Sequence, residues 1–236
     1  TTSLAEAEGG AVYGRMGAST QEFGGICQWL INTLNALTGN LDEPGGVMFT
    51  LPAVDVVKGV GGINRPGKFA RWHSRVRGLP EFDGELPAAV MAEEMLTEGE
   101  GQIRGLVTSA GNPVISTPNG VQVDTALAGL DFMVSVDFYI NETTRHANVI
   151  LPPTSPLERD HYDLVFNLFS VRNTAKYSPA LFEPAEGALH DWQIMLELEK
   201  RLSGGMKTRA VQAARRWAGP AGILDFALRT GPYGGG

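Results

Sequence analysis

Three short apolar runs decide the fold: QIRGLVTSAGNP (residues 102–113), DFMVSVDFY (131–139) and NVILPP (148–153). Each run is typical of a buried strand and stops at turn-forming or strand-breaking residues. Between the runs lie GVQVDTALAGL (120–130), which predicts a short helix, and NETTRHA (141–147), which predicts a helical turn. Buried strands joined by short helical crossovers form βαβ units and a parallel sheet. We therefore predict an α/β fold with a Rossmann-like parallel sheet that carries helical and irregular insertions.

Polar residues follow the predicted strands. In open α/β sheets, ligands bind outside the carboxyl ends of the strands. Gly111 allows the backbone to come close to a ligand, and the amide of Asn112 offers hydrogen-bond donors and acceptors. The Asp137 carboxylate can accept two hydrogen bonds from a ribose or from the N–H edge of a guanine. The candidate nucleotide-binding residues at or near the strand ends are Ser109, Gly111, Asn112, Ser116, Asp137 and Asn148.

The same residues also have a purely structural interpretation. Gly-Asn-Pro is a common turn sequence, and Asp137 could cap the turn that follows it. On the residues alone, nucleotide binding and plain turns stay open as alternatives. We assign no catalytic and no metal-ligating residue, because the four His residues lack zinc-site spacing and the sequence has no GxSxG motif.

A second strong pattern lies upstream. Ser19 and Glu22 have the spacing of a helix capping box, and Gly39 is a natural helix end. Between them the apolar residues recur with helical spacing and predict one buried face, on which Cys27 is expected to be an inert core thiol. The residues of this predicted face are Phe23, Ile26, Cys27, Leu30, Ile31, Leu34 and Leu37.

Composition limits the classes of function. A net charge of −7 argues against a nucleic-acid partner. The single cysteine excludes an internal disulfide framework, and no apolar run has the length of a membrane span. No signal peptide is visible, and the N-terminus reads as a cut within a longer protein, while the closing GPYGGG reads equally as a cut or as a flexible end. The expected organisation is the end of a preceding lobe (1–18), a helix and turn (19–51), an irregular excursion (52–100), a βαβ nucleotide-binding core (101–151), an irregular insertion (152–190) and C-terminal helices (191–236).

Four segments together resemble a known family. They are AVYGRMGASTQEFGGICQWLINTLNALTGNLDEPGG (11–46), GLVTSAGNPVISTPN (105–119), LDFMVSVDFYINETTRHANVILPPTSPLERD (130–160) and HDWQIMLELEKRL (190–202). In order and spacing they resemble the molybdopterin oxidoreductase family, which includes formate dehydrogenases, nitrate reductases and dimethyl sulfoxide reductases. The resemblance covers about residues 10–205.

The resemblance implies a cofactor and a site. In that family the large subunit holds two molybdopterin guanine dinucleotides, whose dithiolenes bind molybdenum or tungsten, and each of two α/β lobes binds one nucleotide. Carried over, the loop Gly111–Pro113, Ser116 and Asp137 would contact one guanine dinucleotide, and the loop 13–17 would lie near a pterin. Asn148 occupies a position that is usually Asp in the family's ADVVLP stretch, so the charge of that side chain is lost here.

The resemblance also implies missing parts. Family members usually begin with an iron–sulfur cysteine cluster, followed by the residue that ligates the metal, and neither is visible in this sequence. We therefore expect an internal fragment of the large subunit that does not turn over substrate by itself. Any iron–sulfur cluster would belong to the missing N-terminal part. The expected partners are the remaining domains of the parent chain and electron-transfer subunits, in a cytoplasmic protein, with a periplasmic parent left open.

Two other interpretations remain. A molybdopterin-like domain can persist without cofactor as a structural part of a respiratory complex. The chain could also be an unrelated Rossmann-like nucleotide-binding domain, such as the central domain of a thiamine diphosphate enzyme, although the upstream LTGN and PGG turns argue against this.

Overall fold

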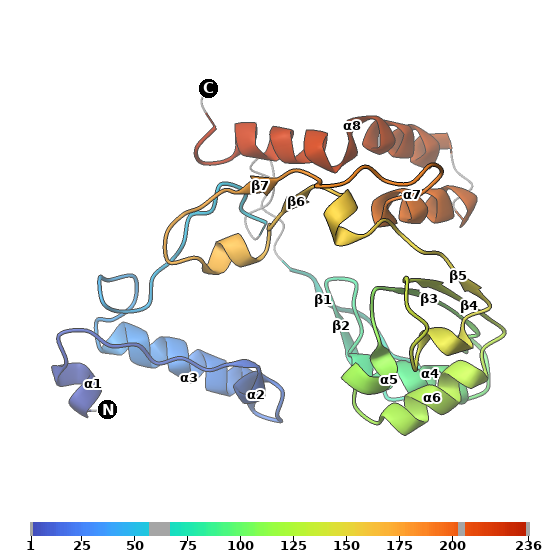
Figure 1. Cartoon of the computed structure of the whole chain (residues 1–236). Coiled ribbons are helices and arrows are strands. Elements are labelled where there is room, and N and C mark those ends of the chain that lie inside the picture. Colours follow the sequence, from blue (N-terminus) through green and yellow to red (C-terminus); the bar gives the residue numbers. More distant parts are fainter. Residues whose placement is uncertain (1, 57–66, 203–205, 235–236) are drawn as a thin grey trace. The chain divides into compact units, whose positions relative to one another are not determined.

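The chain forms two compact units, which are described separately (Figure 1). The computed structural model describes residues 2–56, 67–202 and 206–234. The first unit consists of residues 1–53 and 164–175, and the second of residues 54–163 and 176–236.

A three-stranded parallel sheet is the centre of the second unit. Its strands are β3 (Gly105–Ser109), β4 (Phe132–Val136) and β5 (Val149–Ile150), in the order β3-β4-β5. The register pairs Gly105 with Phe132 and Ser109 with Val136, so β3 and β4 end at the same edge. Helix α6 (Gly120–Ala128) connects β3 to β4, and the short 3₁₀ helix η3 (Thr144–His146) connects β4 to β5. The predicted α/β class and parallel sheet are confirmed.

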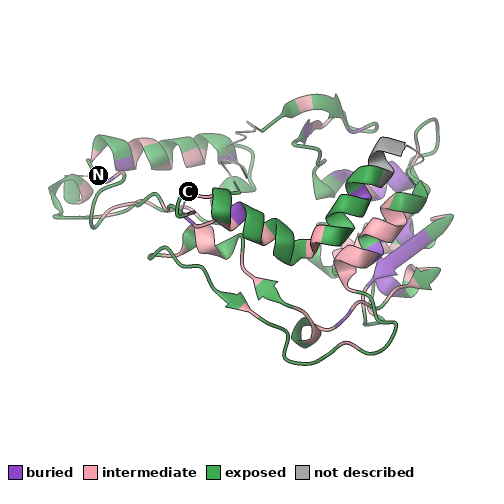
Figure 2. Cartoon of the chain, turned by 90° about the horizontal axis from the view of Figure 1, so that it is seen from above, coloured by how far each residue is buried: buried purple, intermediate pink, exposed green. Residues whose placement is uncertain are grey.

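The hydrophobic core lies between this sheet and two helices. Helices α4 (Met91–Leu96) and α6 pack against each other and against Met133 of the central strand, which is fully buried. A parallel sheet buries its central strand, and β4 is buried from its second residue to its last. Figure 2 shows the buried residues concentrated around the sheet and sparse on the long helices. The core cluster consists of Ala92, Met95, Val123, Ala126, Leu127 and Met133.

The stretch 52–100, expected to be irregular, contains regular elements among its described residues, and 57–66 lie outside those residues. Strands β1 (Phe69–His73) and β2 (Pro80–Phe82) pair antiparallel, and η2 (Ala88–Val90) leads into α4. The buried carboxylate of Glu81 organises the hairpin, because it accepts hydrogen bonds from the backbone N–H groups of Arg71 and Gly84 and from the Arg71 guanidinium. The Arg71 guanidinium holds the pKa of Glu81 below its usual range. Such short elements, held by one side chain, leave little periodicity in the sequence.

The upstream helix differs from its prediction at its start. The structure has a short helix α2 (Met16–Ser19) and then α3 (Gly24–Leu37), so Ser19 and Glu22 do not cap the main helix. The chain turns tightly before α3, because a Cβ at Gly24 would lie 2.0 Å from the Ser19 carbonyl oxygen. Gly39, with a φ of 72°, follows the helix end as predicted.

The face of α3 that was predicted to be buried is exposed in the first unit, and that prediction is wrong for the described residues. Phe23, Ile26, Leu30 and Leu37 are exposed, and Cys27, Ile31 and Leu34 are half-buried. Apart from Gly24, the buried residue of α3 is Asn35, whose amide binds the backbone of Val12.

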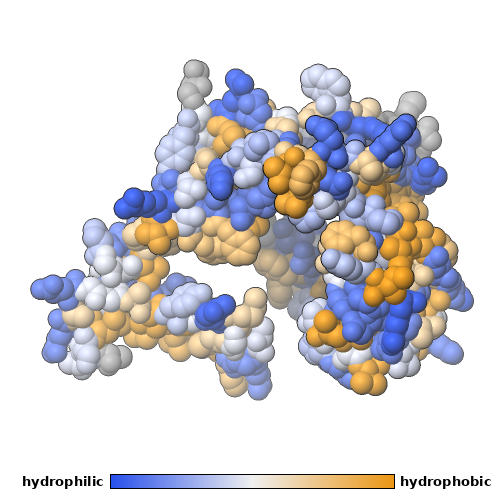
Figure 3. All heavy atoms as spheres, viewed as in Figure 1, coloured by the Kyte–Doolittle hydropathy of each residue, from blue (hydrophilic) through white to orange (hydrophobic). Residues whose placement is uncertain are grey.

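The remaining elements are short strands, turns and two C-terminal helices. Helix α7 (Asp191–Leu202) begins where the C-terminal helices were predicted to begin, and α8 (Met206–Thr230) is interrupted at Gly219, before Pro220. No helix among the described residues has the length and apolar character needed to cross a membrane. Exposed apolar side chains are frequent on the surface (Figure 3). The other elements are α1 (Thr2–Glu6), α5 (Pro113–Ser116), η4 (Pro156–Glu158), β6 (His161–Tyr162), η5 (Phe166–Phe169) and β7 (Tyr177–Ser178), with β6 and β7 antiparallel.

Candidate functional site

The loop after β3 turns at Ala110 rather than at Gly111. Ser109 is the last residue of β3, and Ala110, with a φ of 50°, donates its N–H to the Val136 carbonyl at 3.0 Å. Pro113 then opens the short helix α5. A Cβ at Gly111 would meet only ordinary contacts, 3.8 Å from the Ser109 carbonyl oxygen. Packing within the chain therefore does not require a glycine at position 111. The space beside its backbone is open to a ligand.

Asn112 ties this loop to the loop that follows β4. Its Nδ2 donates to Glu142 Oε2 at 2.7 Å, and its Oδ1 accepts from the Thr143 hydroxyl at 2.7 Å. The Thr143 hydroxyl also accepts from the Val114 N–H at 3.1 Å, and Thr143 is completely buried. The Ser116 hydroxyl donates to the Asn112 carbonyl oxygen at 3.0 Å. Asn112 and Ser116 thus have structural partners within the chain.

Asp137 lies directly after β4, at the carboxyl edge of the sheet. Its Oδ1 accepts hydrogen bonds from the N–H groups of Phe138, at 2.7 Å, and Tyr139, at 3.0 Å. Its Oδ2 forms no hydrogen bond with any residue that the structure describes, and the side chain is half-buried. One oxygen therefore fixes a turn, as the structural interpretation predicts, while the other is free to bind a ligand.

Asn148 does not join these residues. Its N–H donates to the Met133 carbonyl at 2.9 Å, and its Oδ1 accepts from the Met133 N–H at 2.7 Å. Met133 is four residues before Asp137, which corresponds to about 13 Å along a strand. The side chain of Asn148 extends the β4–β5 ladder at the opposite end of the sheet from Asp137.

The residues of NETT (141–144) build the loop after β4, and none of them was predicted to belong to the nucleotide site. The Thr144 hydroxyl donates to the Tyr139 carbonyl at 2.8 Å, and the Asn141 Oδ1 accepts from the N–H groups of Thr143 and Thr144. The hydrogen bond from Asn112 holds the pKa of Glu142 below its usual range, with the Arg145 charge as a weaker cause. The paired threonines of NETT, directly after a strand, were the available signal for buried hydroxyls in this loop.

We call Ser109, Gly111, Asn112, Asp137 and Glu142 the strand-end site. It carries two carboxylates, and Arg145, whose charge acts on Glu142, is paired with Asp124 at 2.6 Å. Among the described residues, no group of three or more His, Cys, Asp and Glu side chains could hold a metal ion. The site is therefore anionic and suits the N–H or O–H donors of a ligand better than its phosphates.

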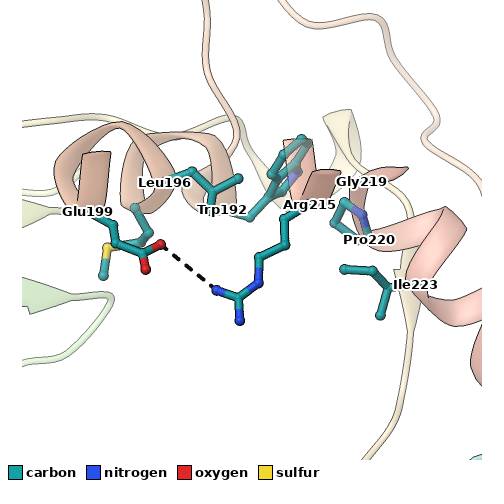
Figure 4. A pocket seen from close by; sticks show the side chains of 8 residues that line it. Trp192, Leu196, Glu199, Arg215, Gly219, Pro220 and Ile223 are labelled. Carbon is teal, nitrogen blue, oxygen red and sulfur yellow. Dashed lines mark ion pairs between the residues drawn. The ribbon is translucent and has the colours of Figure 1, made fainter. Parts of the chain in front are cut away.

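A cavity of about 430 Å³ lies elsewhere, between α7 and α8 (Figure 4). Its walls are mostly apolar, and Arg215 and Glu199 line it as an ion pair with 3.9 Å between Nη1 and Oε2. None of the strand-end residues lines this cavity. Volume alone does not make a site, and the convergent polar groups lie at the sheet edge. The cavity is lined by Trp192, Met195, Leu196, Glu199, Arg215, Gly219, Pro220 and Ile223.

The sequence of the chain is similar to known oxidoreductases. It is 37% identical over 150 residues to an assimilatory nitrate reductase catalytic subunit of Bacillus subtilis, which covers 60% of this chain and 20% of that protein. It is 26% identical over 181 residues to the F420-dependent formate dehydrogenase subunit alpha of Methanocaldococcus jannaschii, covering 74% of this chain and 26% of that protein. A similar protein of Methanococcus maripaludis, an F420-dependent formate dehydrogenase 1 subunit alpha, is 27% identical over 73% of this chain and 26% of its own length.

The chain thus spans between 20% and 26% of the length of these relatives. A family model described as molybdopterin oxidoreductase matches residues 4–201, which include the strand-end site and the helices on both sides of it in the sequence. This confirms the resemblance drawn from the four segments. The chain belongs to the molybdopterin oxidoreductase family.

Proposed function

We propose that this chain binds a molybdopterin guanine dinucleotide at the strand-end site and acts as part of a larger catalytic subunit. The observation that carries the proposal is the free Oδ2 of Asp137, which lies at the carboxyl edge of two parallel strands that end in register. This is the edge at which open α/β sheets bind nucleotides.

The charge of the site argues for one orientation of the nucleotide. The carboxylates of Asp137 and Glu142 would repel phosphates, whereas a ribose hydroxyl or the N1–H and N2–H groups of guanine would donate to the Asp137 Oδ2. We therefore infer that the base or ribose lies at Asp137. The backbone at Gly111, which has room for a ligand, would contact the same nucleotide from β3.

The chain would serve to hold and orient the cofactor. When bound, the cofactor would supply two-electron redox chemistry at molybdenum or tungsten, and the protein positions it and excludes water. Cys27 is half-buried on α3, so we do not infer that it ligates the metal. The relatives act on nitrate or formate according to their names, but the strand-end site contains no feature that selects either substrate for this chain.

A cofactor-free structural domain is the second candidate, and a specific observation favours it. Asn112, Ser116 and one oxygen of Asp137 all have hydrogen-bond partners within the chain. These hydrogen bonds hold the conformation of the loops without a ligand. The two candidates differ in the role of the free Asp137 oxygen, which only the cofactor-binding proposal uses.

The test is the cofactor content of the full-length protein that carries this chain, purified anaerobically. We expect molybdenum or tungsten by elemental analysis and GMP after acid hydrolysis. Asp137→Ala should lower cofactor occupancy by about 10-fold, because a hydrogen bond to a charged group is lost. Asp131→Ala is the matched control, since Asp131 lies just before the same strand and makes an exposed ion pair with Arg104.

Asp131→Ala should leave occupancy unchanged, because exposed ion pairs contribute little. Well-folded protein that contains neither metal nor GMP would overturn the proposal in favour of the structural domain. Equal occupancy in both variants would remove Asp137 from the site.

A further inference from the structure

The loop between Asp137 and Thr144 is held in one conformation by hydrogen bonds among its own residues. Asp137 accepts two backbone N–H groups, the Asn141 N–H donates to the Thr144 hydroxyl at 2.8 Å, and that hydroxyl donates to the Tyr139 carbonyl at 2.8 Å. Thr143 and Thr144 are completely buried. Hydrogen bonds to buried hydroxyls are costly to break, so this loop cannot rearrange cheaply.

The same loop holds three consecutive apolar side chains in solvent. Phe138 is 48% exposed, Tyr139 68% and Ile140 82%. The rings of Phe138 and Tyr139 pack edge to face, with centroids 4.9 Å apart and an angle of 68° between their planes. A contiguous apolar surface on a loop that cannot fold back to bury it marks a binding surface.

The neighbouring carboxylate decides what this surface would bind. The Asp137 side chain comes directly before Phe138 and keeps one oxygen without a hydrogen bond to any described residue. Aliphatic side chains of a protein segment would cover the rings but would offer no hydrogen-bond donor to that oxygen, which makes its desolvation unfavourable. A flat heterocycle with N–H groups on its edge would stack on a ring and donate to the carboxylate at the same time.

We propose that Tyr139, supported by the edge-packed ring of Phe138, is the surface on which the purine base of the bound nucleotide stacks. This inference rests on the proposed function and adds to it a residue that distinguishes a base from a sugar phosphate. Asp137 would read the N–H edge of the base, while Tyr139 contributes affinity through ring contact that any purine can use.

The experiment is isothermal titration of the full-length protein that carries this chain, freed of bound cofactor, with two probes, GMP and ribose 5-phosphate. Tyr139→Leu keeps an apolar side chain but removes the ring, and we expect it to weaken GMP binding about 10-fold to 100-fold. Tyr139→Phe keeps the ring and should bind GMP as the unaltered protein does. Ribose 5-phosphate should bind equally to all three, since it has no base.

Phe182→Ala is the control for loss of an exposed aromatic ring in the same unit, and it should leave GMP binding unchanged. If Tyr139→Leu binds GMP as tightly as the unaltered protein while Asp137→Ala does not, stacking is overturned and the proposed nucleotide site survives. If the unaltered full-length protein binds no GMP at all, the nucleotide site at Asp137 fails, and the stacking proposal fails with it. Circular dichroism of each variant verifies that the fold is intact.

Discussion

At the scale of single residues, the strand-end site depends on contacts between segments that are distant in the sequence. The position of Asp137 after a strand could be predicted, because strand ends are visible in the sequence as a change from apolar to polar residues. The partner of Asn112 could not, since Thr143 is 31 residues away and its hydroxyl has no sequence pattern of its own. The place of Asn148 could not be predicted for the same reason, because its pairing with Met133 is set by the register of the strands.

Thr143 gives the sharpest prediction at this scale. Thr143→Val keeps the shape of the side chain but leaves the Asn112 Oδ1 and the Val114 N–H without their partner. We expect the free energy of unfolding to fall by about 1–3 kcal/mol, the cost of unsatisfied buried polar groups. Urea denaturation of the chain measures this.

The matched control is Thr125→Val, where an exposed hydroxyl donates to the Val121 carbonyl within α6. That change should alter the free energy of unfolding by no more than about 0.5 kcal/mol. Equal stability of both variants would show that the Thr143 hydroxyl is not needed to join the two loops.

At the scale of elements, the sequence predicted the strands and helices that have a clear periodicity or an apolar run. Strands β3, β4 and β5 and helices α6 and α7 lie where the patterns placed them. The hairpin of β1 and β2 and helix α4 were missed, because they are short and depend on Glu81 and on packing against α6. Short elements take their stability from tertiary contacts rather than from local propensity.

The central strand of the sheet gives a prediction about stability. Met133 on β4 is fully buried among residues of α4 and α6. Met133→Ala should lower the free energy of unfolding by about 2–5 kcal/mol through lost burial and the cavity left behind. Val121→Ala on α6, where the side chain is exposed, should change it by less than about 0.5 kcal/mol. Thermal and urea denaturation, followed by circular dichroism, measure the stability of both variants. Similar unfolding midpoints for the two variants would contradict the prediction.

At the scale of the whole molecule, burial is unequal between the two units. Apart from Pro52, every buried apolar side chain among the described residues, from Val54 to Ala227, belongs to the second unit. The first unit exposes the apolar face of α3. Its buried residues are mainly polar and hydrogen-bonded, such as Asn35 and Asn40. Local stability follows buried apolar contacts, so the two units should open with different free energies.

Hydrogen exchange of the purified chain tests this difference. After correction for intrinsic rates, the amides of β4 should exchange at least about 100-fold more slowly than those of α3. The same peptides in denaturing urea are the control and should exchange alike. Protection of α3 equal to that of β4 would show that its apolar face is covered in solution.

The sequence by itself determined the α/β class, the parallel sheet, the family and the place of Asp137 at a strand end. These follow from apolar runs, turn residues and motif order, which are local along the chain. Only the tertiary structure decided that Asn112 is held by Thr143 and Glu142, that Asn148 lies at the other end of the sheet, and that one oxygen of Asp137 stays free. It also decided that the apolar face of α3 is exposed. The physical reason is that hydrogen-bond partners and burial depend on which distant segments meet, and periodicity along the chain does not carry that information.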